Sequence, residues 1–497
     1  MRKEVAPMET NQSQIDLDQK HLEQFGYKQE LQRTLKFFSN FGVAFTYLSP
    51  VVGFYSLFAF GLQTGGPAFF WGIPIVVAGQ LLVVLVFSEL AAKYPLAGAL
   101  YQWARRLMGG GYGWFVGWFY GWALLITITA VDYGGAPYIA SALGMAGTQS
   151  QLVLITLVMI VIQTLINMLG ITRLSILINI GVAMEVLGTL GIGIILLFFP
   201  HQPAAIVNTT MGVQGHHSYW PAFLLALLFS GFIFYGFESA ADVAEEVIDP
   251  RRRVPKAMIW ALLAGGATTM FAVFAFLHAT PDMALAMNAA KTPNPVTYIL
   301  SATIGATSSK IFLWVVIIAF LSCGAAVEAA ATRVFYSYAR DRVIPFHRFL
   351  SHVSSKYHTP TNALWLSAAV ALLLSLSARF ESILTSFAVV GIYLAFQMIM
   401  LGALIARSRG VKADRLFDLK AWAWPINILA LIYGIAMIVN LARPTTPSAP
   451  WYINYEVMLA TAAIIVIGFL VYYLSSAARQ ARQLDKEPAA PANSEAQ

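Results

Sequence analysis

Twelve stretches of the sequence are long and apolar enough to cross a lipid bilayer as α-helices. The hydrocarbon layer demands roughly 20 mostly apolar residues per helix, because every backbone N–H and C=O inside it must be paired within the segment. We place the twelve spans at residues 41–62, 69–92, 112–140, 152–169, 174–199, 220–243, 254–279, 311–338, 363–376, 383–405, 421–441 and 455–474. The pattern predicts an all-α integral membrane protein with twelve transmembrane helices.

The composition supports a bilayer as the solvent of this chain. Of 497 residues, 58% are hydrophobic and only 11% are charged, and the mean hydropathy is +0.67. An ordinary soluble domain carries about 25% charged residues. So few charges leave long stretches that have no means of facing water, which argues against a soluble enzyme.

The positions of lysine and arginine predict the orientation. With the amino terminus inside, the outer loops hold only Lys291, Lys310, Arg379 and Arg443, and the rest of the 31 basic residues lie on the inner side. Short loops rich in Lys and Arg stay cytoplasmic. We therefore expect a multi-pass protein of the plasma (inner) membrane with both termini in the cytoplasm. The net charge of +7 is a topology signal rather than a sign of nucleic-acid binding.

The two ends of the chain differ in composition from the apolar region between them. Residues 1–36 are polar and should form a cytoplasmic tail, either solvated or partly an amphipathic helix at the membrane face. Residues 37–478 should form the twelve-helix transporter domain, and residues 479–497 a disordered cytoplasmic tail. The single Cys323 excludes internal disulfides and a cysteine-based metal cluster. We expect no metal and no cofactor.

Two spans contain helix-breaking residues near mid-membrane. The first span carries Pro50 and Gly53 within "TYLSPVVGFY", and the sixth carries Gly231 and Gly236 within "FSGFIFYGFES". Proline removes a backbone donor, and glycine loosens a helix. Interrupted helices of secondary transporters expose N–H groups to a substrate carboxylate and C=O groups to an ammonium. The alternative is that these residues serve close helix packing.

The spacing of the two predicted breaks also suggests an internal repeat. It makes five spans per half, and an odd number inverts the second copy relative to the first. Repeat one would cover residues 41–199 and repeat two residues 220–405, with helices 11 and 12 at 421–474 outside the repeat.

Several segments resemble a known family of transporters. They are "GYKQELQRTLKFFSNFGVAFTYLSPVVGFYSLFAFGLQTGGPAFFWG", "FSELAAKYPLAGALYQW", "GFESAADVAEEVIDPRRRVPKAM" and "ATRVFYSYARDRVIPFHRFLSHVSSKYHTPTNAL". Together they resemble the amino acid–polyamine–organocation superfamily, within it the amino acid/choline transporter branch. The resemblance implies a five-plus-five inverted repeat (a leucine-transporter-like fold), with a small amino acid or amine bound between helices 1, 3, 6 and 8.

The resemblance also implies which backbone groups of helix 1 bind the substrate. The break maps to Ser49 through Gly53, where the N–H groups of Val52 and Gly53 would meet a carboxylate. The common Gly-Ser/Ala-Gly form is replaced here by Val51 and Val52. We therefore expect the side-chain help of a serine to be lost.

In helix 6, the resemblance implies that carbonyls near Phe232 and Tyr235 face the amino group, with Gly231 at the same break. Phe232 matches the position at which relatives place a gating aromatic, and it would close over the substrate. The alternative is that Phe232 packs like the neighbouring phenylalanines.

Acidic residues inside the spans need a reason, because a charge at mid-bilayer costs about 2.5–3.5 kcal/mol on insertion scales. Glu185 lies near the middle of the fifth span, and this span contains no Lys or Arg. It is a candidate proton-coupling group, or else a neutral acid that is hydrogen-bonded for structure. Asp132 and Glu328 are weaker candidates, and either could contact a cationic substrate or only line a water-filled cavity.

The predicted function is secondary active transport of amino acids or related small amines, such as γ-aminobutyrate, by alternating access. A proton gradient, or alternatively a sodium gradient, would drive it, since the phosphate-binding pattern GxxxxGK[ST] does not occur. The alternatives are a choline or polyamine transporter and a nutrient receptor on the same fold that no longer transports. Besides the lipid bilayer we predict no nucleic-acid partner. The exact substrate and the oligomeric state stay open.

Overall fold

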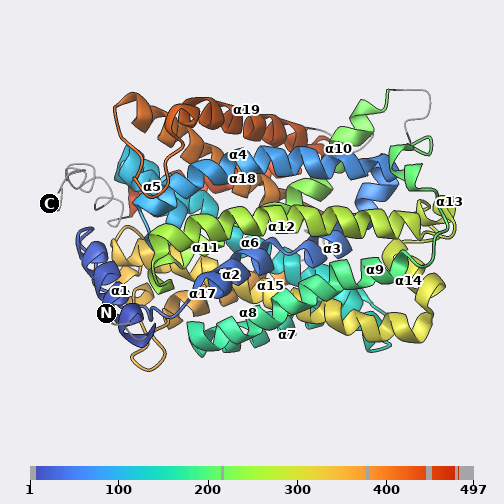
Figure 1. The fold of residues 1–497 in the computed structure, drawn as a ribbon, viewed down its shortest axis with the longest axis horizontal. Helices are drawn as coiled ribbons and strands as arrows, with labels where there is room; N and C mark the ends of the chain where they lie inside the picture. The colour runs from blue at the N-terminus through green and yellow to red at the C-terminus, as the bar shows by residue number, and fades with distance from the viewer. Residues whose placement is uncertain (1–6, 214–217, 377–380, 444–449, 476–479, 481–497) are drawn as a thin grey trace, which may run out of the picture.

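The computed structural model describes residues 7–213, 218–376, 381–443, 450–475 and 480. In this part of the chain the regular elements are all helices, and the only β-type pairings are two isolated bridges. The long helices lie side by side and cross the molecule in one common direction (Figure 1). The expected tail at residues 479–497 lies almost entirely outside the described residues.

Ten helical stretches of the described chain are long and apolar enough to cross a membrane. They are α2 (Phe37–Leu48) with α3 (Pro50–Gly65), η1 (Pro67–Trp71) with α4 (Gly72–Lys93), α6 (Gly110–Ala142), α7 (Gln149–Met168), α8 (Ile171–Val186) with η2 (Leu187–Gly191) and α9 (Ile192–Leu196), α12 (Pro250–His278), α15 (Ala306–Arg340), α18 (Glu381–Ser408), η6 (Lys420–Trp422) with α19 (Ala423–Ala442), and α21 (Glu456–Leu474).

Three further helices are apolar but shorter: α10 (Trp220–Ile233), α14 (Pro295–Ile304) and α17 (Thr361–Ser375). Two of them occupy expected spans. The span expected at 220–243 is interrupted: it is α-helical to Ile233 and again over Ser239–Asp242, and Gly236, which has a positive φ of 101°, lies between the two parts. The span expected at 363–376 corresponds to α17. The helix α14 did not figure among the expected spans.

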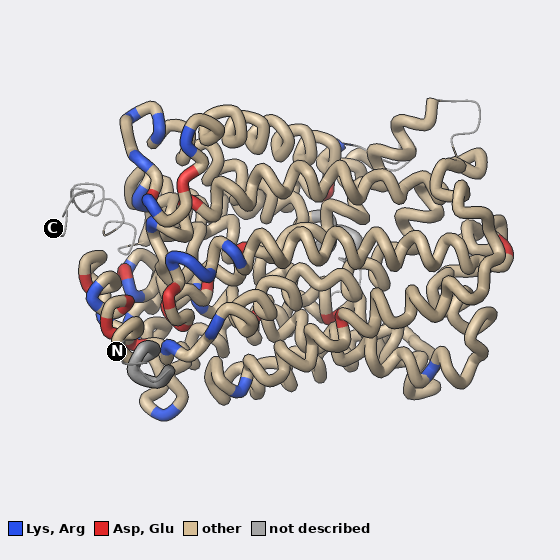
Figure 2. The backbone as a smooth tube through the Cα atoms, in the orientation of Figure 1, with Lys and Arg blue, Asp and Glu red and all other residues tan. Residues whose placement is uncertain are grey.

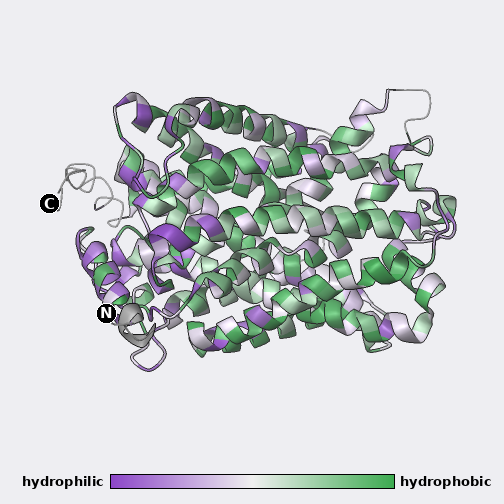
Figure 3. Cartoon of the chain, in the orientation of Figure 1, coloured by the Kyte–Doolittle hydropathy of each residue, from purple (hydrophilic) through white to green (hydrophobic). Residues whose placement is uncertain are grey.

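The surface of the bundle is apolar along its flanks. Leu165 of α7, Ile432 of α19 and Val466 of α21 are each more than half exposed. Green, hydrophobic residues run along most of the length of the helices in Figure 3, and purple ones gather at one end. Because soluble proteins rarely expose contiguous apolar patches of this extent, these flanks match the hydrocarbon of a membrane.

Charged residues gather at one end of the bundle, on the left in Figure 2. We call this the charged end. The helix α1 (Pro7–Glu23) and the chain that follows it pack there, and Leu22, Leu31 and Leu35 are buried. The segment before the first span is therefore folded against the bundle, and this differs from the solvated tail that the sequence left open.

Candidate functional site

The first span is interrupted at Ser49. The helix α2 ends at Leu48, Ser49 adopts a left-handed conformation with φ 43° and ψ 86°, and α3 begins at Pro50. Proline disfavours helical geometry at the residue before it and lacks the N–H that would continue the helix. The predicted local break is confirmed.

The polar groups of this break are already paired within the chain. Glu185 accepts a hydrogen bond from the Val51 amide at 2.8 Å and another from the Ser49 hydroxyl. The Val52 amide donates to Ser49 Oγ at 3.1 Å, and the Gly53 amide donates to Ser49 O at 3.1 Å. The first turn of α3 is therefore capped by a carboxylate and a hydroxyl of the protein itself.

The hydrogen bonds show what the groups that we predict to bind the substrate contact in this conformation. The amides of Val52 and Gly53, which we predict to meet a substrate carboxylate, are both bonded to Ser49 in this conformation. Val51 and Val52 carry no hydroxyl, and the hydroxyl of Ser49, the residue before Pro50, caps the helix. The reason is the left-handed turn at Ser49, which swings its side chain over the new helix end.

The sixth span is interrupted between α10 and the short helix α11 (Ser239–Asp242). Within the break, the Gly236 amide donates to Glu238 Oε2 at 2.8 Å, and Ser239 Oγ donates to Gly236 O at 2.7 Å. The carboxylate of Glu238 therefore accepts a hydrogen bond from the backbone of the break itself. The second predicted break is also confirmed.

The two breaks lie directly against each other. A Cβ added to Gly236 would lie 2.9 Å from the amide nitrogen of Leu48, the residue before Ser49, and 2.7 Å from the Tyr47 ring. The packing of α3 on α10 is equally close, since a Cβ added to Gly53 would lie 2.2 Å from Ile233 Cγ1. Two interrupted helices thus meet in the buried interior, where backbone outside regular helices is otherwise rare.

The remaining predicted residues of the sixth span divide into two groups. The rings of Phe232 and Tyr235 meet edge to face at a centroid distance of 5.8 Å, and both are buried. The Tyr235 hydroxyl lies near Thr127 without a hydrogen bond of normal geometry. Gly231 lies elsewhere, because a side chain there would point at Met437 of α19. The structure therefore does not bring Gly231 to the first break.

Glu185 is fully buried at the end of α8, where the helix changes its geometry. The next turn, η2, is π-helical, and Thr189 Oγ1 donates to Glu185 O at 2.6 Å. A Cβ added to Gly188 in this turn would lie 2.6 Å from Val51 Cγ2. Such π-turns are frequent at functional sites. Sequence reasoning selected Glu185 but missed its partners in the first break, which lie over 130 residues away.

Asp132 and Glu328 belong to a second buried cluster between α6, α7 and α15. Gln163 Nε2 donates to Asp132 Oδ1 at 2.6 Å. Glu328 accepts from Thr164 Oγ1 at 2.6 Å and from Asn167 Nδ2 at 2.9 Å. These side chains hold three helices together, and both acids lie outside the two helix breaks.

Two buried ion pairs lie at the charged end of the bundle. The guanidinium of Arg333 binds Glu246 in a bidentate pair with Nε–Oε1 at 2.7 Å, and Arg340 binds Glu245 at 2.8 Å. Both glutamates come from the segment after α11, and both arginines come from the last turns of α15. The sixth span is therefore tied to α15 immediately beyond the break.

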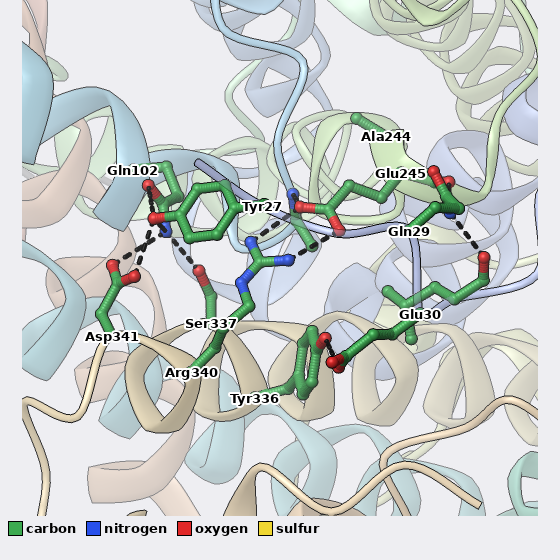
Figure 4. A network of polar contacts seen from close by, with 12 residues as sticks. Tyr27, Gln29, Glu30, Gln102, Ala244, Glu245, Tyr336, Ser337, Arg340 and Asp341 are labelled. Atoms are coloured by element: carbon green, nitrogen blue, oxygen red, sulfur yellow. Dashed lines mark hydrogen bonds and ion pairs between the residues drawn. The ribbon is translucent and has the colours of Figure 1, made fainter. Parts of the chain in front are cut away.

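The segment of residues 27–35, which we call the N-terminal strap, lies beside the ion pair of Arg340 and Glu245 (Figure 4). The Tyr27 hydroxyl donates to Asp341 Oδ1 at 2.7 Å and accepts from Arg105, while Arg340 lies over its ring at 3.8 Å. Burial, together with Asp341, raises the pKa of Tyr27 above its ordinary value, so the hydroxyl stays a donor.

Further contacts extend the strap to the loop after the sixth span. Tyr336 Oη donates to Glu30 at 2.6 Å, and Gln29 Nε2 donates to Glu245 O at 3.0 Å. Leu35 forms a parallel bridge with Val247. The strap thus bridges α15 and the segment after α11. The sequence marked residues 27–35 as part of a family-like segment but not these contacts.

Comparison with known proteins shows to which family this sequence is similar. Residues 35–470 match a family described as amino acid permease. The amino-acid permease BAT1 of Arabidopsis thaliana is 26% identical, over 93% of this chain and 95% of its own length. The polyamine transporter TPO5 of Saccharomyces cerevisiae is 23% identical (90% and 77%), and the GABA-specific permease of the same yeast is 25% identical (76% and 70%).

Proposed function

The chain belongs to the amino acid permease family, and from this premise we propose that it moves amino acids or related small amines across a membrane by alternating access. It is a multi-pass membrane protein, and its relatives are permeases rather than enzymes. The names of the relatives include a GABA permease and a polyamine transporter, so an ammonium group is the chemistry that they share.

The observation that carries the proposal is the meeting of two interrupted helices in the buried interior. Gly236 of one break touches Leu48 of the other. We propose that the substrate binds there, between Ser49, Val52 and Gly53 on one side and the Phe232–Tyr235 segment on the other, with Phe232 as a gate. Unpaired carbonyls at a helix interruption suit an ammonium group, and amides at a helix start suit a carboxylate.

We further propose that the fold is a twelve-helix, five-plus-five inverted repeat. In this arrangement α10 and α11 are two parts of one interrupted sixth span, and the short helix α17 is the ninth span. Repeat one would cover residues 41–199 and repeat two residues 220–405, with α19 and α21 outside. Support comes from the positions of the breaks at Ser49 and Gly236, in the first helix of each repeat.

We place the charged end in the cytoplasm and the protein in the plasma (inner) membrane, with both termini inside. The support is the concentration of Lys and Arg at that end (Figure 2). In this orientation the N-terminal strap and the two buried ion pairs would form the closed cytoplasmic gate, and the conformation described here would be closed to the cytosol.

Glu185 is the group that we propose for coupling to a proton gradient. It is a fully buried acid with no basic partner among its described contacts, and it touches the break of the first span directly. A residue that changes charge there alters the binding site itself. Sodium is the alternative driving ion, and a difference between proton-driven and sodium-driven uptake separates the two.

Uptake by purified protein in liposomes tests the proposal. The vesicles are made alkaline inside, and the probes are labelled leucine, γ-aminobutyrate, putrescine and choline. We expect concentrative uptake of at least one ammonium-bearing probe, and its loss in Gly53→Trp, because Gly53 lies against Ile233. The matched control is Ile194→Trp, at a position that is 54% exposed on α9. Binding of a probe without uptake would identify a receptor instead.

A further inference from the structure

The hydrogen-bond donors of the first break form a site that already holds a carboxylate. The donors are the Val51 amide, the Val52 amide and the Ser49 hydroxyl. Two of them donate to Glu185, and the third is bonded to the Ser49 oxygen, which itself donates to Glu185. A substrate carboxylate would seek these same donors, because they lie at the positive end of the α3 dipole.

The surroundings of Glu185 offer no charge that would let two carboxylates stay there together. The titratable groups near it are Tyr55 of α3 and the Cys323 thiol of α15, which are ordinarily neutral at pH 7. The helices α2 and α7, which also pack on α8, contain no charged residues, and Glu328 of α15 is bonded to Thr164 in the separate cluster.

Two ionised carboxylates a few ångströms apart in a water-excluded site repel each other strongly. One of them must therefore take up a proton or leave. Protonation of Glu185 weakens its hold on the Val51 amide, because a neutral acceptor forms a weaker hydrogen bond than a charged one. The amide is then available to a second carboxylate.

The chain next to Glu185 is built irregularly. The π-helical turn η2 (Leu187–Gly191) follows it directly, and Gly188 of this turn packs on Val51. The backbone next to Glu185 therefore lacks the regular i to i−4 hydrogen bonds of an α-helix, so a small movement of this turn breaks no such bonds.

We propose that Glu185 is a tethered competitor of the substrate carboxylate, so that each carboxylate-bearing substrate binds together with one proton. The proton comes from the aqueous phase and forms an O–H bond on the Glu185 carboxyl group, and the substrate carboxylate then accepts the hydrogen bond from the Val51 amide. The inference rests on the proposed function and adds to it the substrate class, amino acids that retain a free carboxylate.

The same arrangement treats amines without a carboxylate differently. Such a molecule has no group that competes for the Val51 amide, so Glu185 can remain ionised in its place while the ammonium is bound. Its affinity should therefore be almost independent of pH between 6 and 8, where neither a primary amine nor a substrate carboxylate changes charge.

The first arm of the test compares two probes of similar length on the wild-type protein: γ-aminobutyrate and putrescine. Half-saturation concentrations are measured by uptake and, independently, by thermal-shift titration at pH 6, 7 and 8. We expect the value for γ-aminobutyrate to rise with pH by up to about tenfold per unit, because one proton is bound with each substrate. The value for putrescine, where it binds, should change less than about twofold.

The second arm uses variants. Glu185→Gln keeps an acceptor for the Val51 amide but cannot be charged, so the half-saturation concentration for γ-aminobutyrate should no longer depend on pH. Glu185→Asp should restore the slope. The control Glu456→Gln removes an acid from the first turn of α21 and should keep the wild-type slope.

Three results would overturn the inference: a slope that persists in Glu185→Gln, equal slopes for both probes, or a flat profile for γ-aminobutyrate in the wild type. Failure of the proposed function looks different, because then no probe is bound or taken up by the wild-type protein at any pH. Since the wild-type comparison needs no variant, poor folding of a variant does not remove the test.

Discussion

Gly53 of α3 lies so close to Ile233 of α10 that a Cβ added there would be 2.2 Å from Ile233 Cγ1. The contact joins the segments that follow one helix break and precede the other. Because only glycine leaves room for this approach, the first prediction concerns the smallest possible enlargement of that residue.

Gly53→Ala should reduce transport while leaving the protein folded. Inserting a methyl group into a packed contact costs about 1–3 kcal/mol, which corresponds to a loss of about 5- to 150-fold in the population of the closely packed state. The measurement is the initial rate of uptake at equal protein in liposomes. Gly191→Ala is the control, because its Cβ would meet only ordinary contacts at 3.5 Å or more, and wild-type rates in Gly53→Ala would contradict the assignment.

Ser49→Ala should destabilise the break of the first span. The substitution removes the acceptor of the Val52 amide and a donor to Glu185, and loss of such a cap costs about 0.5–2 kcal/mol. The measurement is the melting temperature of the wild type and the variant, with the folded fraction after heating determined by size-exclusion chromatography. Ser367→Ala is the matched control, since that buried hydroxyl only donates to Ala363 O of its own helix, and an equal effect of the two would speak against a special role of Ser49.

Breaking the buried pair of Arg333 and Glu246 should be far more costly than breaking a partly exposed pair. Arg333→Gln leaves a buried carboxylate unpaired, which costs about 3–5 kcal/mol. Adding Glu246→Gln should recover part of that loss. In Arg251→Gln the broken pair with Asp414 is one-third exposed on the arginine side, and the expected cost is about 0–1 kcal/mol. Melting temperatures that fall equally in both single variants would refute the distinction.

Tyr27→Ala should loosen the closure at the charged end. The hydroxyl bridges Arg105 and Asp341, and the ring supports Arg340. We expect faster alkylation of Cys323, the single cysteine, by a membrane-permeant maleimide, because opening of this end leads toward the interior. Tyr357→Ala, whose ring lies beneath Lys356, serves as the control. Unchanged alkylation in Tyr27→Ala would remove the N-terminal strap from the gate.

Local chemistry allowed much of this fold to be predicted from the sequence. Hydropathy located the long helices to within a few residues, since a bilayer demands a run of apolar residues. The breaks were predictable because Pro50 and Gly236 act on the chain at their own positions. Within the described residues, ten long apolar helices are found where twelve spans were expected, because the spans expected at 220–243 and 363–376 contain the shorter helices α10 and α17.

Long-range partners were beyond such reasoning. Glu185 stood out as an acid without a base, but nothing local to it reveals that its carboxylate caps α3 through the Val51 amide. The orientation of Gly231 depends on the packing of α19, which no motif of the sixth span encodes. The N-terminal strap uses Tyr27 and Gln29, ordinary polar residues whose partners lie hundreds of positions away.

We propose that the substrate binds where the two helix breaks meet, and the reactivity of Cys323 tests this directly. Its thiol donates to the backbone oxygen of Tyr47 at 3.4 Å, two residues before Ser49, and lies near both Tyr235 and Glu185. The measurement is the alkylation rate of Cys323 in liposomes as a function of substrate concentration, with Cys323→Ser as the blank. We predict that a transported substrate slows alkylation several-fold, with half-protection at the concentration that half-saturates uptake. An alkylation rate that stays the same at saturating substrate would contradict the account.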